Sequence, residues 1–188
     1  MPTSPHPYAL NWSLNFWGCY RMYVPQTTYR AHVLRSPKTT IAPETLVEIL
    51  SVLIILITRF PEYLSSEEIK PPPIAVLAPL LSHPRPVVRK RAIASLAQFI
   101  PISHHTLFQQ LLELHVYPYL IPSASVEKQR TTVQLIAAVT RHSPTQMGPI
   151  VFKLMPGILD AIKKDDDELT EGCLQVSFKF LALLSCFT

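Results

Sequence analysis

The residues best suited to metal binding are three histidines and one acidic run, and neither completes a site. His104, His105 and His115 could each supply an imidazole nitrogen, but no cysteine or carboxylate stands at a spacing that completes a tetrahedral set. The acidic run from Asp165 to Glu168 lacks the alternating oxygen donors and the bend glycine of a calcium loop. We therefore predict no metal site, and we interpret the histidines as exposed helix-start residues and the acidic run as a helix cap.

The residues needed for covalent catalysis or for nucleotide binding do not form a complete set either. The four glycines are too few and too scattered for a phosphate-binding loop or a nucleophile elbow. Cys173 could act as a nucleophile, but it shares a helical stripe with Leu169, Val176 and Phe180, which favours a buried packing residue. We expect no enzymatic activity, no cofactor and no small-molecule substrate.

The basic cluster formed by Arg85, Arg89, Lys90 and Arg91 has three possible interpretations. It could be the solvated face of a helix, a contact for an acidic protein partner, or a nucleic-acid or nuclear-import patch. The solvated face is favoured, and the acidic partner comes second. The formal net charge of +4 is modest and mixed in sign along the chain, so we expect no nucleic-acid partner.

Composition and cysteine usage narrow the fold class and the compartment. With 19 prolines and only four glycines in 188 residues, the chain favours helices separated by prolines over hairpin-built sheets. Its three cysteines have no paired short spacing, and no signal peptide opens the chain, so we expect a cytoplasmic or nuclear protein. The most apolar run, residues 46–57, contains Glu48 and is shorter than the roughly 20 residues that cross a bilayer, so we expect no membrane partner.

A repeat is the main structural signal. The segments 77–81, 116–120 and 154–158 share the pattern apolar-x-Pro-x-apolar, and their prolines, Pro79, Pro118 and Pro156, lie 39 and then 38 residues apart. Each proline lies within an apolar stretch long enough for a helix, where it removes a hydrogen bond and bends the axis. A repeated kink indicates a repeated unit.

A second amphipathic helix is predicted after each of these segments, over residues 85–100, 126–141 and 166–184, and residues 44–59 match the second helix of an earlier unit. Two helices every 40 residues is the HEAT or armadillo period. We therefore predict an all-α superhelix of three to four repeats over residues 44–188. Residues 1–43 are proline-rich, carry no sustained stripe, and are predicted to be poorly ordered.

The buried faces follow from apolar stripes at helical spacing. One stripe contains Val88, Ala92, Leu96, Phe99 and Ile100, and the last helix adds Leu169, Cys173, Val176, Phe180 and Leu184. Because residues 183–188 carry no polar cap, we expect this array to be part of a longer one.

With the repeats laid out, the chain resembles the cullin-associated, neddylation-dissociated proteins, which are long HEAT-repeat regulators of cullin–RING ubiquitin ligases. The resemblance rests on residues 80–91, 134–141, 165–169 and 173–175, and it covers residues 44–180. It matches the N-terminal region of that family.

The resemblance implies a non-catalytic scaffold whose partners are a cullin without NEDD8 and its RING subunit. In the family, the full solenoid wraps the cullin, blocks neddylation and promotes exchange of substrate-receptor modules, as in assembly of SCF complexes. The period alone allows an alternative, a generic HEAT adaptor such as a transport-receptor or phosphatase-scaffold fragment.

The binding surface is expected on exposed residues of the second helices, because these helices align on one side of a stacked solenoid. The predicted partner-binding residues are Arg89, Lys90, Gln129, Arg130, Asp166 and Glu171.

Overall fold

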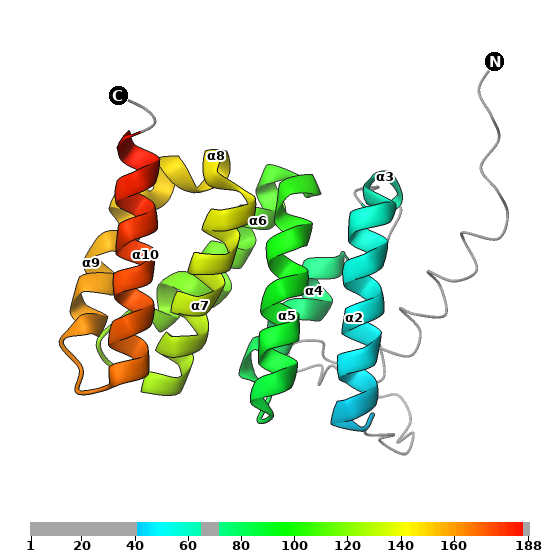
Figure 1. The fold of residues 1–188 in the computed structure, drawn as a ribbon, viewed down its shortest axis with the longest axis horizontal. Helices are drawn as coiled ribbons and strands as arrows, with labels where there is room; N and C mark the ends of the chain where they lie inside the picture. Colours follow the sequence, from blue (N-terminus) through cyan, green and yellow to red (C-terminus); the bar gives the residue numbers. More distant parts are fainter. Residues whose placement is uncertain (1–40, 65–71, 186–188) are drawn as a thin grey trace, which may run out of the picture.

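The layer of second helices forms the front of the molecule. The computed structural model describes residues 41–64 and 72–185, which form helices and turns with no strand among them. Four long helices stand side by side in one row: α2 (Pro43–Arg59), α5 (Pro86–Phe99), α7 (Val126–His142) and α10 (Asp167–Ser185) (Figure 1). Their bounds agree with the predicted second helices to within one residue at each end.

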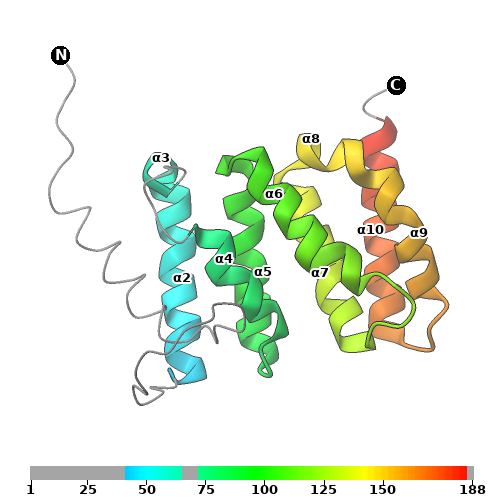
Figure 2. The ribbon, with the colours of Figure 1, turned by 180° about the vertical axis from the view of Figure 1, so that it is seen from behind.

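The first helices lie behind that row and are interrupted. Viewed from behind, α4 (Pro73–Leu77), α6 (His105–Leu111) and α9 (Val151–Ile162) form the near layer (Figure 2). The first two continue as irregular helical turns, namely η1 (Ala78–Ser82) after α4, and the π-helical η3 (Leu112–Val116) and η4 (Tyr117–Tyr119) after α6. Short turns complete the connections: α3 (Pro61–Leu64), η2 (Ile100–Ile102), α8 (Pro144–Met147) and η5 (Gly148–Ile150).

The repeated prolines explain most of these interruptions. Pro79 lies in η1 and Pro118 in η4, where the chain has tightened into a 3₁₀ turn after its first helix. A proline has no N–H to donate, so a change of helix type at these points is expected. At Pro156 the interruption is milder than predicted, because α9 continues through it. Within the described residues, the chain thus forms three helical pairs preceded by α2, and the all-α HEAT-type superhelix is confirmed.

Helix starts follow the local sequence. Pro43 and Pro86 each occupy the first position of a helix, where the missing N–H has no intrahelical partner. At the start of α10 the Asp166 carboxylate accepts a hydrogen bond of 2.8 Å from the backbone N–H of Leu169. This is the geometry of an N-terminal cap, so the interpretation of the acidic run as a cap is confirmed at Asp166.

The predicted stripes form the core. Val88, Ala92, Leu96, Phe99 and Ile100 are buried, as are Leu169, Val176 and Phe180, while Leu184 is partly buried. Cys173 is a free, buried thiol, and loss of solvation raises its pKa to about 11. A thiol held in its neutral form is a packing residue rather than a nucleophile, as predicted.

One close backbone approach joins successive first helices. A Cβ atom at Gly157 of α9 would lie 2.8 Å from Leu120 Cβ and 3.0 Å from the Leu120 carbonyl oxygen. Only glycine lets α9 lie this close to the turn that ends the preceding first helix. The first layer is therefore fixed by contact between repeats even where its helices are short.

Two expectations relate to the ends of the chain and to membranes. The segment expected to be poorly ordered, residues 1–43, falls almost wholly outside the described residues, so that expectation stays a prediction. Among the helices that the structure describes, none combines the length and the hydropathy needed to cross a bilayer.

Candidate protein-binding face

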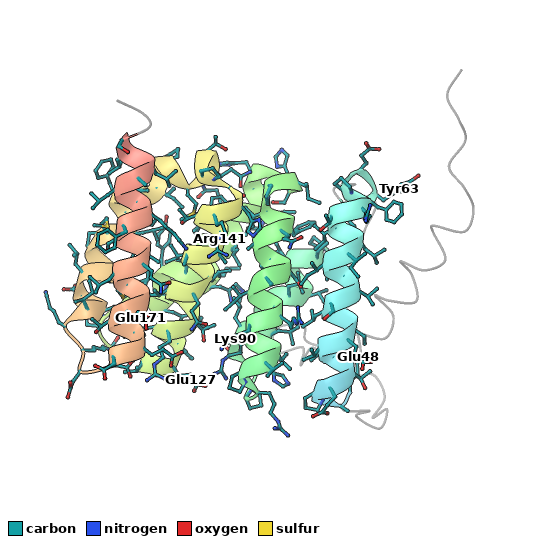
Figure 3. The ribbon with its side chains drawn as sticks, viewed as in Figure 1. Glu48, Tyr63, Lys90, Glu127, Arg141 and Glu171 are labelled. Carbon is teal, nitrogen blue, oxygen red and sulfur yellow. The ribbon has the colours of Figure 1, made fainter. Side chains whose placement is uncertain are left out.

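The exposed side of α2, α5, α7 and α10, which we call the second-helix face, carries charged side chains on all four helices, beside exposed apolar side chains such as Val52 of α2 and Phe178 of α10. Glu48 on α2, Lys90 on α5, Glu127 and Arg141 on α7, and Glu171 on α10 lie on this side of the molecule (Figure 3). All five side chains are exposed. The face therefore carries charges of both signs on a regular array of helices.

A pocket of about 270 Å³ opens on this face between α5, α7 and α10. Its charged and amide walls come from α5 (Arg89, Lys90), α7 (Glu127, Arg130, Gln134) and α10 (Glu168). We call this the three-helix pocket. It lies where three consecutive repeats meet, so it exists only because the repeats are stacked.

Arg89 joins the first two helices of this pocket. Its guanidinium Nη1 lies 2.9 Å from Glu127 Oε1 on α7, and the same nitrogen donates to the carbonyl oxygens of His83 at 2.8 Å and Pro84 at 3.1 Å. The Arg89 side chain is only 15% exposed. Arg89 therefore holds the turn before α5 and ties α5 to α7.

Arg130 joins the second and third helices. Its Nε donates to Asp166 Oδ1 at 2.9 Å, its Nη2 pairs with Asp166 Oδ2, and its Nη1 donates to Glu168 Oε2 at 2.8 Å. Two parallel bonds to one carboxylate form the strongest common arginine geometry. The hydrogen bond from Arg130, followed by that from the Leu169 N–H, lowers the pKa of Asp166, and the hydrogen bond to Asp166 raises the pKa of Arg130.

Lys90 differs from both arginines. It is exposed, and its ammonium has no hydrogen bond or ion pair with any residue in the described part of the chain. Helix α5 contains no acidic residue that could compensate it. Lys90 is thus the one charged side chain on the wall of the three-helix pocket that has no partner among the described residues.

The six predicted partner-binding residues lie in three environments: some are exposed, some are enclosed by ion pairs, and one is buried. Lys90 and Glu171 are exposed on the second-helix face, as expected. Arg130 and Asp166 are paired with each other, which leaves the Asp166 side chain 13% exposed. Arg89 is similarly enclosed.

The predicted exposure of Gln129 is wrong. This side chain is buried, and its Nε2 donates to the carbonyl oxygen of Ile121 at 2.9 Å. It stands at i, i+4 and i+7 spacing with the buried residues Val133 and Ile136, so helical spacing places it on the buried stripe of α7 and only its polar side chain suggested exposure. Gln129 therefore stabilises a repeat from inside and is not available to a partner.

Sequence reasoning missed Glu127, Gln134 and Glu168 on the pocket wall. A signal for two of them was present, because Arg89 precedes Glu127 and Arg130 precedes Glu168 by the same 38 residues, which is one repeat period. Opposite charges one period apart on the same helix type lie on neighbouring second helices. Such pairs can be sought in any repeat sequence before its structure is known.

The histidines match the helix-start interpretation only in part. His104 and His105 are exposed at the start of α6, where His104 Nδ1 accepts a hydrogen bond from the Thr106 N–H. His115 instead lies in η3, partly buried, and burial lowers its pKa. Within residues 41–64 and 72–185, no three histidine, cysteine or acidic side chains are placed to hold a metal ion.

Comparison with known proteins gives one consistent group of relatives. No protein-family model matches the chain. The chain is 36% identical over 107 residues to cullin-associated NEDD8-dissociated protein 2 of Rattus norvegicus, which covers 56% of the chain and 8% of that protein. The protein of the same name from Mus musculus is 35% identical over 107 residues, covering 56% of the chain and 9% of the relative.

A third organism has a similar protein. Cullin-associated NEDD8-dissociated protein 1 of Dictyostelium discoideum is 35% identical over 107 residues, covering 53% of the chain and 8% of that protein. The chain therefore spans less than a tenth of the length of these relatives. The resemblance inferred from the repeat motifs is confirmed for a segment of them.

Proposed function

We propose that the chain is a non-catalytic scaffold that binds a cullin–RING ubiquitin ligase whose cullin carries no NEDD8. The observation that carries this proposal is the 35–36% identity over 107 residues to proteins named for their association with cullins. The second-helix face is the proposed contact surface, with Lys90 and Glu171 as the members of the predicted set that are free to meet a partner.

The fold suits this role because its exposed charges are held at fixed spacing. Ion pairs join α5 to α7 and α7 to α10, and the packed stripes fix the helices from behind. A surface that is ordered before binding loses little conformational entropy on association. Charges of both signs on such a surface favour correct orientation of a charged partner and exclude partners with the wrong pattern.

Promotion of substrate-receptor exchange belongs to the same proposal and follows from linkage. A scaffold promotes exchange if it binds the cullin more tightly when the receptor module is absent, because each ligand then weakens the other by the same factor. The chain needs no catalytic group for this effect. It needs only a surface that overlaps, or couples to, the site of the module it displaces.

The test is direct binding of the purified full chain to a cullin–RING complex, with and without NEDD8 on the cullin. We expect saturable binding to the unmodified complex and weaker binding to the modified one. Binding to neither form would contradict the proposal. Binding instead to a transport GTPase or to phosphatase subunits would support the generic HEAT adaptor that the repeat period alone allows.

A further inference from the structure

We infer that the three-helix pocket receives a carboxylate side chain from an acidic segment of the partner protein, with Lys90 as its principal donor. This inference rests on the proposed function only in taking the partner to be a protein that docks on the second-helix face. It adds the chemical class of the partner's docking residue, a carboxylate, and it names Lys90 as the residue that binds this group.

The charge arrangement of the pocket walls favours an incoming anion. Both acidic side chains on the wall already have cationic partners, since Glu127 pairs with Arg89 at 2.9 Å and Glu168 pairs with Arg130 at 2.8 Å. Lys90 has no such partner in the described part of the chain. A partner's cation would have to displace an existing pair while facing Lys90, whereas a partner's carboxylate can accept from Lys90 without breaking any contact.

The size and the field of the pocket favour one carboxylate over a polyanion. A volume of about 270 Å³ lies below the roughly 300–1,000 Å³ of sites that enclose drug-sized ligands, so a single side chain is the fitting occupant. Glu127 and Glu168 remain 67% and 56% exposed at the walls. Because these carboxylates are paired, Lys90 is the single unpaired cation on the wall among the described residues, and it can balance one carboxylate but not the dense row of phosphates of a nucleic-acid backbone.

The walls are also fixed before a ligand arrives. Arg89 is held by two carbonyl oxygens of the preceding turn, and Arg130 by a bidentate contact with Asp166. Gln134 donates to Glu168 Oε1 at 3.4 Å, which restrains the third wall. Lys90 is therefore the unpaired donor in a pocket whose other charged walls are restrained, and these walls limit the entropy lost when an acidic side chain enters.

The first test compares two charge reversals on one helix. Lys90→Glu changes the pocket, whereas Arg91→Glu makes the same charge change at the next residue, which is exposed but lies outside the pocket wall. We expect Lys90→Glu to weaken binding of the unmodified cullin–RING complex about tenfold, Lys90→Gln to weaken it about threefold, and Arg91→Glu to change it less than twofold. Equal losses of affinity for Lys90→Glu and Arg91→Glu would overturn the inference, because they would show that binding depends on the overall positive potential of α5 and not on the pocket.

The second test does not depend on cullin binding. A six-residue peptide rich in aspartate and glutamate is added to the isotopically labelled full chain, and backbone amide shifts are followed by NMR, with the matching asparagine–glutamine peptide as control. We expect saturable shifts confined to the pocket walls with the acidic peptide and none with its control, and the Lys90→Gln variant should lose these shifts. Shifts spread over every exposed cation, or larger pocket shifts with a single-stranded oligonucleotide, would overturn the inference.

The two tests separate the two proposals. If the acidic peptide binds the pocket while the cullin–RING complex does not bind at all, the proposed function fails and the pocket assignment stands. If the complex binds and neither Lys90 variant changes its affinity, the pocket assignment fails and the proposed function stands. Folding is not at risk, because Lys90 is exposed and makes no hydrogen bond or ion pair with the described residues that its replacement would remove, and equal melting curves for all variants check this.

Discussion

The two helical layers of this molecule are built on different rules. The second helices are continuous, with 14 residues in α5, 17 in α7 and 19 in α10, and their only prolines are at the first position. The first helices are short or contain a proline: α4 has 5 residues and α6 has 7, each is followed by irregular turns that contain Pro79 or Pro118, and α9 contains Pro156. The contrast shows that the second helices, and not the first, can present side chains at regular intervals.

The regular layer carries the charged pairs between repeats, and the interrupted layer carries close backbone contacts. Arg89–Glu127 and Arg130–Glu168 join neighbouring second helices at their exposed side, whereas Gly157 lets α9 approach the Leu120 backbone at the rear. The front of the solenoid is therefore open to a partner at positions set by helix geometry. The rear is adapted to packing between repeats.

The largest effect on stability is expected in the core of the regular layer. Leu96 of α5 is fully buried, so Leu96→Ala should lower the free energy of unfolding by about 2–5 kcal/mol through lost burial and a residual cavity. Urea denaturation followed by circular dichroism measures this change. The matched control is Val87→Ala on the same helix, where the side chain is 57% exposed and the expected change is within about 0.5 kcal/mol. Equal losses for the two variants would show that α5 is not packed as described.

A smaller effect on stability is expected when a glycine of each layer is replaced by alanine. Gly157→Ala places a methyl group against the Leu120 backbone, and we expect a net loss of about 1–2 kcal/mol, because overpacking exceeds the helix propensity gained. In α10 the nearest atom to a Cβ at Gly172 is Val133 Cγ1, at 3.2 Å. A side-chain methyl can shift where a backbone carbonyl cannot, so Gly172→Ala should cost less than Gly157→Ala. The comparison is of urea midpoints, and the opposite order would contradict this account of the first layer.

The smallest of the stability effects is the pH dependence of the Asp166–Arg130 pair. The folded-state pKa of Asp166 lies below its unfolded value, so its stabilisation is present above the unfolded pKa, near 3.9, and is lost as pH falls through the folded pKa. Asp166→Asn keeps a capping side chain but removes the charge. We expect the variant to be less stable than the wild type at pH 7 and the difference to shrink towards pH 2. A difference that stays constant across this range would show that the charge contributes nothing.

Patterns confined to one helix predicted the fold and its core. The proline spacing and the polar turns located α5, α7 and α10, and helical periodicity identified the burial of Leu96 and Phe180. These features depend on residues that are close in sequence, where spacing determines direction. The type and order of the elements could be predicted for that reason.

The features that the sequence did not reveal, namely the enclosure of two predicted binding residues and the location of the pocket, depend on contacts between elements. Gln129 is polar and was therefore predicted to be exposed, but it lies on the buried stripe of α7 and donates to the turn at Ile121. Arg89 is enclosed by the turn at His83 and Pro84. Both lie about one helical turn after the start of a second helix, where a long polar side chain reaches back to the preceding turn. The three-helix pocket depends on three separate repeats and could be located only with their relative positions known.

The central claim is that the second-helix face, rather than the first layer, meets the cullin–RING partner, and a charge swap that preserves net charge tests it most directly. Lys90→Glu with Glu171→Lys alters the front, and the matched control, Lys153→Glu with Glu113→Lys, alters exposed residues of the first layer. The measurement is the dissociation constant of the unmodified complex for each double variant of the full chain. We expect the front variant to bind about tenfold more weakly, which is about 1.4 kcal/mol, and the control to stay within about twofold of the wild type. Unchanged binding by the front variant, or an equal loss in the control, would contradict the account.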